Sequence, residues 1–316
     1  MLKSAYKAKI KFEWSRDMIF IYYAGLFLCS AMTTFSQQKY GRAIRHRTDI
    51  WVYALITGII SMLFFGITSG FSILLNRKTF IYSLILTVMA IISYFVQLLV
   101  YRYMGVVEVA VITMSGKLLL TSIVGFLLFS ETVSLISVAR IVLMLITVLL
   151  IFAHNKKGNS KKNDSVQPFT LIGLLLCVAI VGIGVLNTVV LKYVAIDAEV
   201  TSSDALFFFT NAMIALFSVL FLLFESHGSI ETVAKEFRAI SKSGYLAIIA
   251  KTVAGSASSL LGVLILANGD VSLYSPLSNA LGLLATEAVA VFILRERPKI
   301  IPMIPAILAI ALAFFG

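Results

Sequence analysis

The chain has 316 residues, of which 60% are hydrophobic and 13% charged, and its net charge at pH 7 is +11. Soluble domains are about 45–50% apolar and about 25% charged, so this composition argues against a soluble protein and for a membrane protein. Its Lys and Arg residues stand in short polar segments between apolar runs, where contact with anionic lipid headgroups explains the charge better than nucleic acid does.

Long apolar segments follow one another along the chain. A helix needs about 20 mostly apolar residues to cross about 30 Å of hydrocarbon. Lipid offers the backbone no hydrogen-bond partners, so continuous runs of this length predict helices. The sequence therefore predicts an all-α integral membrane protein with ten transmembrane helices, at residues 18–38, 51–75, 79–103, 106–129, 133–153, 169–193, 203–224, 245–267, 271–294 and 299–316.

The N-terminal tail, residues 1–17, is basic, and the apolar run behind it exceeds a signal-peptide core, so this run is taken as the first span. The positive-inside rule places such a tail in the cytoplasm. The joint after the first span and the linker at 154–168 are also basic, and with ten spans they lie on the opposite side from the tail. The charges therefore give conflicting orientations.

Two joints are long and polar. The segment 154–168 is rich in Lys, Asn and Ser and reads as a linker. It divides the chain into a first five-helix repeat with the basic tail (1–153) and a second five-helix repeat (169–316). The other joint, 225–244, is either a polar loop or an amphipathic helix at the membrane interface. In the second case one helical face carries Ile230, Val233, Ala234, Phe237 and Ile240.

The two halves share short motifs. "QKY" (38–40) ends the first span and "LKY" (191–193) ends the sixth, while "FSETVS" (129–134) follows the fourth and "LRERPK" (294–299) follows the ninth. Because each half has an odd number of spans, the halves are expected to be inverted in the bilayer. Inverted repeats typify secondary transporters that bind substrate near the midplane between them.

This layout resembles the drug/metabolite transporter (DMT) superfamily, most closely its EamA-like bacterial members. The residues that carry the resemblance are "VVEVAVITMSGKLLLTSIVGFLLFSETVS" (106–134), "GVLNTVVLKYV" (184–194) and "GDVSLYSPLSNALGLLATEAVAVFILRERPK" (269–299). It implies a transporter, in a bacterial plasma membrane, whose halves rock against each other. The first four spans of each half would line a central cavity, with the fifth peripheral. Cargoes across the family are diverse.

Three of the ionisable residues inside predicted spans are site candidates, because charges there are expensive and usually face the bundle interior. Lys117 lies about halfway along the fourth span, too deep to reach either surface easily, and is a candidate contact for an anionic or zwitterionic solute. Glu287, in the ninth span, is a candidate for binding a cation or a proton, or for a salt bridge with Lys117 or Lys251. Lys251, about two turns into the eighth span, is a substrate candidate that could instead snorkel to the surface.

Uncharged polar side chains at membrane depth are further candidates, either lining the substrate path or forming hydrogen bonds between helices. Tyr94 and Gln97 lie one turn apart on the third span. The others are Asn187, Asn211 and Asn279. When "MSGK" (114–117) of the first half is aligned with "PLSN" (276–279) of the second, Asn279 is the counterpart of Lys117.

Other functions fit the sequence less well. The chain has no HExxH motif, so a metalloprotease is not expected, and no P-loop, so an ATP-driven pump is not expected. No other enzyme activity is expected either. No metal or cofactor is predicted, and the expected partners are membrane lipids and a small-molecule substrate, with a homodimer left open. The leading hypothesis is a transporter of a polar anionic or zwitterionic metabolite such as an amino acid. The alternatives are a cation or multidrug exporter using Glu287 and a non-transporting receptor or scaffold. Spans one and six lack the carboxylate with which four-span multidrug relatives couple to protons.

Overall fold

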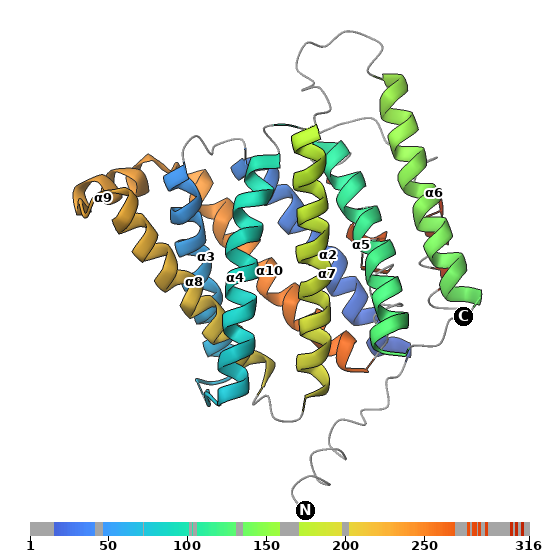
Figure 1. Ribbon diagram of the computed structural model, residues 1–316, viewed down its shortest axis with the longest axis horizontal. Coiled ribbons are helices and arrows are strands. Elements are labelled where there is room, and N and C mark those ends of the chain that lie inside the picture. Colours follow the sequence, from blue (N-terminus) through green and yellow to red (C-terminus); the bar gives the residue numbers. More distant parts are fainter. Residues whose placement is uncertain are drawn as a thin grey trace, which may run out of the picture.

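The computed structural model describes residues 16–41, 47–71, 73–100, 103, 106–130, 135–158, 171–197, 202–268 and scattered positions between 277 and 312. Within this part of the chain every regular element is a helix (Figure 1). The helices are α2 (Arg16–Gly41), α3 (Arg47–Thr68), α4 (Arg77–Val100), α5 (Val106–Leu128), α6 (Leu135–Gly158), α7 (Leu171–Ile196), α8 (Ser203–Glu225), α9 (Ile230–Ala239) and α10 (Lys242–Asn268).

Each of the first eight predicted spans corresponds to one helix. Among the described residues, five helical segments are long and apolar enough to cross a membrane: Thr48–Thr68, Arg77–Gln97, Leu171–Ile196, Ser203–Glu225 and Lys242–Leu266. The predicted all-helical membrane architecture is thereby confirmed. The last two predicted spans lie largely outside the described residues, although the described positions within 277–289 and 304–312 are helical. The total of ten helices and the inverted repeats stay predictions.

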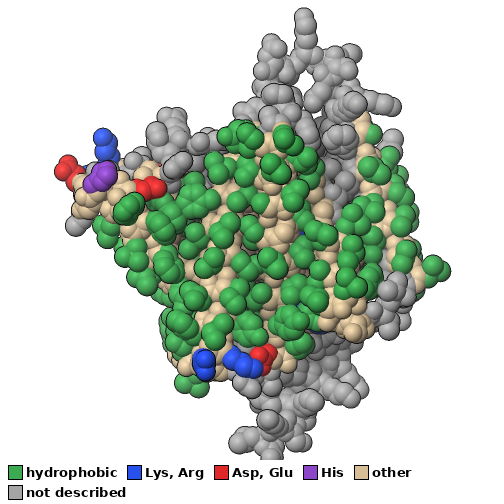
Figure 2. Space-filling view, in the orientation of Figure 1, with side chains coloured by type: hydrophobic (Ala, Val, Ile, Leu, Met, Phe, Trp, Pro, Cys, Tyr) green, Lys and Arg blue, Asp and Glu red, His purple; other side chains and the backbone are tan. Residues whose placement is uncertain are grey.

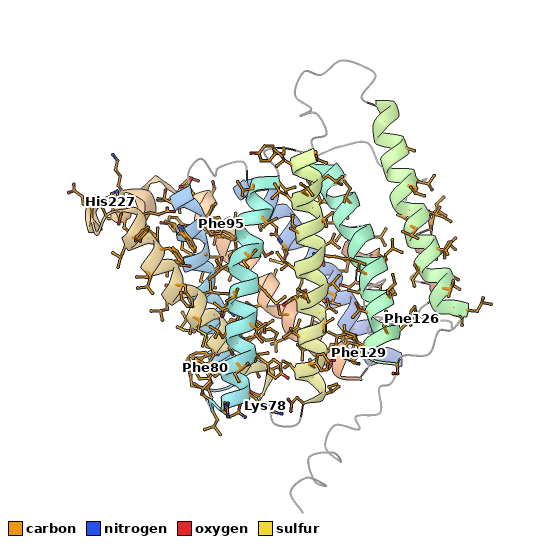
Figure 3. All side chains as sticks on the ribbon, viewed as in Figure 1. Lys78, Phe80, Phe95, Phe126, Phe129 and His227 are labelled. Atoms are coloured by element: carbon orange, nitrogen blue, oxygen red, sulfur yellow. The ribbon has the colours of Figure 1, made fainter. Side chains whose placement is uncertain are left out.

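The outer surface of the bundle is apolar. Side chains such as Leu127, Leu135 and Phe224 are 75%, 86% and 79% exposed, whereas soluble monomers rarely expose large continuous apolar patches. Figure 2 shows a broad hydrophobic face, with the visible charged side chains near its upper-left and lower edges. Figure 3 marks these two ends by His227, where α8 ends, and Lys78, where α4 begins. These features indicate an integral membrane protein, and we refer below to the His227 end and the Lys78 end.

The α3 and α8 helices cross in close contact. Gly58 allows it, because a Cβ there would lie 2.9 Å from both the Ala215 nitrogen and the Asn211 carbonyl oxygen. Around this pair α4 packs on α7 and α8, and α10 packs on α2 and α3. The α6 helix packs on α5 at the edge of the bundle (Figure 1), which agrees with a peripheral fifth span.

The α3 helix ends at Thr68, seven residues before the predicted end at 75. Gly70 and Phe71 take left-handed conformations (φ 59° and 56°), and the Phe71 N–H donates to the Gly66 carbonyl at 2.8 Å. This is a Schellman ending, which stops a helix whatever the hydropathy of the next residues. The α8 helix ends in the same way, with left-handed His227 and Gly228.

The segment 225–244 contains the short helix α9, so of the two readings the amphipathic helix is confirmed. Val233, Phe237 and Ile240 pack against a cluster around Trp51 and Leu222. The Tyr245 hydroxyl also donates to the Phe237 carbonyl at 2.6 Å. The apolar face of α9 therefore covers the ends of α3 and α8 at the His227 end.

Candidate functional site

Lys251 on α10 points at two aromatic rings. Its Nζ lies 4.4 Å from the centroid of the Tyr53 ring on α3 and 5.8 Å from that of Tyr94 on α4. The rings stand edge to face, with centroids 5.7 Å apart. Tyr53 is buried, whereas Lys251 and Tyr94 keep part of their surface accessible. The lysine therefore lies among helices α3, α4 and α10 instead of snorkelling to the surface.

Hydroxyl contacts between α10 and α3 set the position of Lys251. The Thr252 hydroxyl lies 3.4 Å from that of Thr57, and one turn further on the Ser256 hydroxyl donates to Ser61 at 2.9 Å. Tyr53 lies one helical turn before Thr57 and thus on the same face of α3. The register that joins the hydroxyl groups therefore also brings Lys251 over Tyr53.

Lys117 lies where α5 packs on α7. A Cβ added to Gly184 would overlap the Lys117 side chain and come within 3.0 Å of its Nζ. One turn away in α7, Val181 fills the space beside Gly116 in the same manner. The glycines let the two helices approach closely, and Lys117 occupies the room that the missing side chain of Gly184 leaves.

Neither interior lysine has a carboxylate within ion-pair distance among the described residues. An ammonium group inside an apolar bundle is expensive without a counter-charge. Glu287, the possible salt-bridge partner from the ninth span, and Asn279, the counterpart of Lys117 in the repeat, lie outside the described residues. In the described part of the bundle, an anionic ligand is therefore the chemical group that would best complement Lys117 and Lys251.

The charged groups at the Lys78 end are partnered differently. Lys78 Nζ forms an ion pair with Asp197 at 3.0 Å, and Thr68 donates to Asp204 at 3.2 Å. Lys192 on α7 donates to the Leu266 carbonyl of α10 at 2.9 Å, where lysines commonly satisfy the last carbonyls of a helix. These contacts fasten helix ends together, so the two lysines inside the bundle are the better site candidates.

The rings beside Lys251 lie nearer the His227 end than Lys117 does, although Lys251 itself is nine residues into α10, about 14 Å from that end. Tyr53 is six residues after the start of α3 and Tyr94 six residues before the end of α4, so both lie about 9 Å below the His227 end at 1.5 Å per residue. Lys117, eleven residues into α5, lies about 16 Å from the same end.

The other predicted site residues are placed apart from this cluster or bonded locally. Gln97 donates to the Ser93 hydroxyl at 3.0 Å, one turn back on α4. Asn211 donates to the Phe207 carbonyl at 2.7 Å within α8 and lies at the crossing with Gly58. Asn187 is exposed on α7. Of the uncharged candidates within the described residues, only Tyr94 lies beside a lysine.

Tyr53 is the residue that sequence reasoning missed. It lies in the apolar run "IWVYALITG" (50–58), where a tyrosine reads as packing or as an interfacial anchor. Its only sequence signal is its position one turn before Thr57 in a span with a regular stripe of hydroxyl groups, Thr57 and Ser61. Among the described residues no group of three or more His, Cys, Asp or Glu side chains could hold a metal ion.

No family model and no curated protein matches the chain. Among solved structures 27 chains match. One, described only as the crystal structure of a protein, shares 16% sequence identity with a TM-score of 0.63, over 92% of this chain and 95% of its own. The similarity spans nearly the whole of both chains and concerns the fold alone.

Proposed function

We propose that the chain is a secondary transporter that moves a small polar solute with an anionic group, such as an amino acid or another anionic or zwitterionic metabolite, by alternating access. The observation that carries the proposal is the pair of lysines inside an apolar bundle, with no carboxylate in ion-pair range in the described part of the chain. A solute that supplies the missing negative charge would be favoured over a cation or a neutral compound.

The helix contacts support inverted repeats in the proposed transporter. An exchange of the two halves replaces α2 by α7, α3 by α8 and α4 by α10, and the reverse. Under this exchange the α2–α10 contact becomes the α7–α4 contact, and the α3–α10 contact becomes the α8–α4 contact. The α3–α8 crossing maps onto itself. All of these contacts are present, as expected for two halves related by a twofold axis through that crossing.

The helix ends lead to the same axis. The left-handed pairs Gly70–Phe71 and His227–Gly228 are counterparts at opposite ends of the bundle. If Gly70 is aligned with His227 in the sequence, the same offset aligns Gly58 with Ala215. A Cβ on Gly58 would lie 3.1 Å from that of Ala215, so the two counterparts face each other. A residue meets its own counterpart only at the symmetry axis, and this supports the inverted repeats of a DMT-like layout. A place in a bacterial plasma membrane is proposed on the family resemblance alone.

The first test is the thermal stability of the purified protein against metabolites sorted by charge, because a ligand that binds only the folded state raises the melting temperature. We expect stabilisation by anionic or zwitterionic compounds and its loss in Lys117→Gln. The stabilising compounds are then tested for saturable uptake into proteoliposomes. Stabilisation by cations alone would favour the exporter alternative, and binding without flux would favour a receptor.

A further inference from the structure

Lys251 is held by two aromatic rings and by no carboxylate in ion-pair range among the described residues. Its Nζ faces the rings of Tyr53 and Tyr94, and part of its surface is accessible. Aromatic rings attract a cation through their quadrupoles only, whereas a carboxylate or phosphate offers a full charge and charge-assisted hydrogen bonds, which are stronger. An anion that reaches Lys251 is therefore expected to displace the rings as its partner.

We infer that Lys251, Tyr53 and Tyr94 form an outer site for the anionic group of the solute, separate from Lys117, in which the anion replaces the two rings as partner of the ammonium. The inference rests on the proposed transport of an anionic solute. It adds a second binding position and a specific role for the tyrosines, as competitors of the solute.

The separation of the two sites follows from the fold. The tyrosines lie about 9 Å below the His227 end and Lys117 about 16 Å below it. Lys251 contacts α3 and α4, whereas Lys117 lies against α7. An anion that enters from the His227 end therefore reaches the level of the Tyr53 and Tyr94 rings before that of Lys117.

The outer site also joins the two halves of the chain. Tyr53 and Tyr94 precede the linker and Lys251 follows it. An anion that draws Lys251 away from the rings removes one contact between the halves. Because rocking of the halves has to break such contacts, arrival of the solute would favour the motion that carries it inward.

The test measures binding directly on the purified full-length chain, with inorganic phosphate and L-aspartate as probes at constant ionic strength. Affinity is taken from the shift in melting temperature with probe concentration. Lys251→Gln is compared with Lys235→Gln, which removes an exposed lysine of α9. Tyr53→Leu, which deletes a competing ring, is compared with Tyr53→Phe, which keeps it. Tyr94→Leu repeats the ring deletion at a partly buried position in case Tyr53→Leu does not fold.

We expect Lys251→Gln to weaken binding of at least one probe by about tenfold or more, as loss of a charge-assisted hydrogen bond would, and Lys235→Gln to leave it unchanged. Deleting a ring should tighten binding about two- to fivefold, since the ammonium no longer has to leave an aromatic partner. Tyr53→Phe should resemble the wild type. Tighter binding is the distinctive result, because a tyrosine that merely supported the site would weaken binding when truncated.

Three results would overturn the outer site: a wild type that responds to neither probe, binding unaffected by Lys251→Gln, or weaker binding in both ring deletions. Binding lost only in Lys117→Gln would leave the proposed function intact and remove the outer site. Binding that depends on Lys251, without flux of any anion into proteoliposomes, would support the outer site and contradict the proposed transport.

Discussion

Gly184→Ala is the smallest change that should move Lys117 without removing it. The added methyl group would overlap the lysine side chain, close to its Nζ. The obstruction is the far end of a flexible side chain, so the lysine can swing aside while the helices stay in place. Gly182→Ala is the matched control on the same helix, because a Cβ there has no atom within 4 Å.

The expected effect on stability is small. Alanine in place of glycine inside a helix gains about 0.5–1 kcal/mol, and a lysine forced from its rotamer loses about 0.5–1.5 kcal/mol. These terms nearly cancel at position 184, and only the gain applies at position 182. Binding should respond strongly, because a hydrogen bond to a charged group contributes about 1.5–3 kcal/mol. At about 1.36 kcal/mol per factor of ten, losing it weakens anion binding about 10- to 150-fold.

The assay compares both variants and Lys117→Gln for melting temperature and for anion uptake into proteoliposomes. Gly184→Ala should melt within a few degrees of the wild type yet approach the low uptake of Lys117→Gln, while Gly182→Ala transports normally. The reasoning fails if Gly184→Ala keeps normal uptake while Lys117→Gln loses it. It fails as well if the two glycine variants behave alike.

Three further predictions concern stability, each measured as a change in melting temperature of the purified protein. Gly58→Ala should destabilise by about 1–3 kcal/mol, because its methyl group meets backbone atoms of α8 at 2.9 Å, which cannot turn aside; a neutral result would argue against the close α3–α8 crossing. Gly70→Ala should cost about 1–2 kcal/mol from its left-handed φ of 59° alone, since its Cβ would meet nothing within 4 Å; an unchanged melting temperature would contradict the Schellman ending. Asp197→Asn should cost less than about 1 kcal/mol, because the Lys78 side chain of the ion pair is 43% exposed; a larger loss would mean that this contact holds α4 and α7 together.

The helices were largely predictable because each long apolar run has only one way to satisfy its backbone in lipid. Their ends were less so. The apolar residues after Thr68 extend the hydropathy signal to 75, but the left-handed pair Gly70–Phe71 stops the helix first. A helix end is decided by local backbone conformation, to which a hydropathy pattern over about 20 residues is insensitive.

The site was predictable as a set of polar residues and not as an arrangement. Depth in an apolar run was enough to select Lys117, whereas for Lys251 the sequence left snorkelling to the surface open. The partners of these lysines depend on which helices adjoin, and Tyr53 lies almost 200 residues from Lys251 in the chain. Tyr53 lies beside Lys251 only because hydroxyl contacts fix α10 against α3. Gly184 likewise matters only because α5 and α7 bring Lys117 to it.

If the proposed transport is right, the placement of charge would let an anionic solute leave this bundle as well as enter it. At the Lys78 end, charges are paired with protein groups that never leave, as in Lys78–Asp197 and Lys192 with the Leu266 carbonyl. In the interior the rings around Lys251 are partners of intermediate strength, better than hydrocarbon and weaker than an anion. A carrier needs binding that is favourable enough to admit its solute and weak enough to release it. When the anion departs, the rings contact the lysine again, which lowers the free energy of the empty site and thereby weakens the net affinity for the anion. A fixed carboxylate would instead exclude the solute altogether.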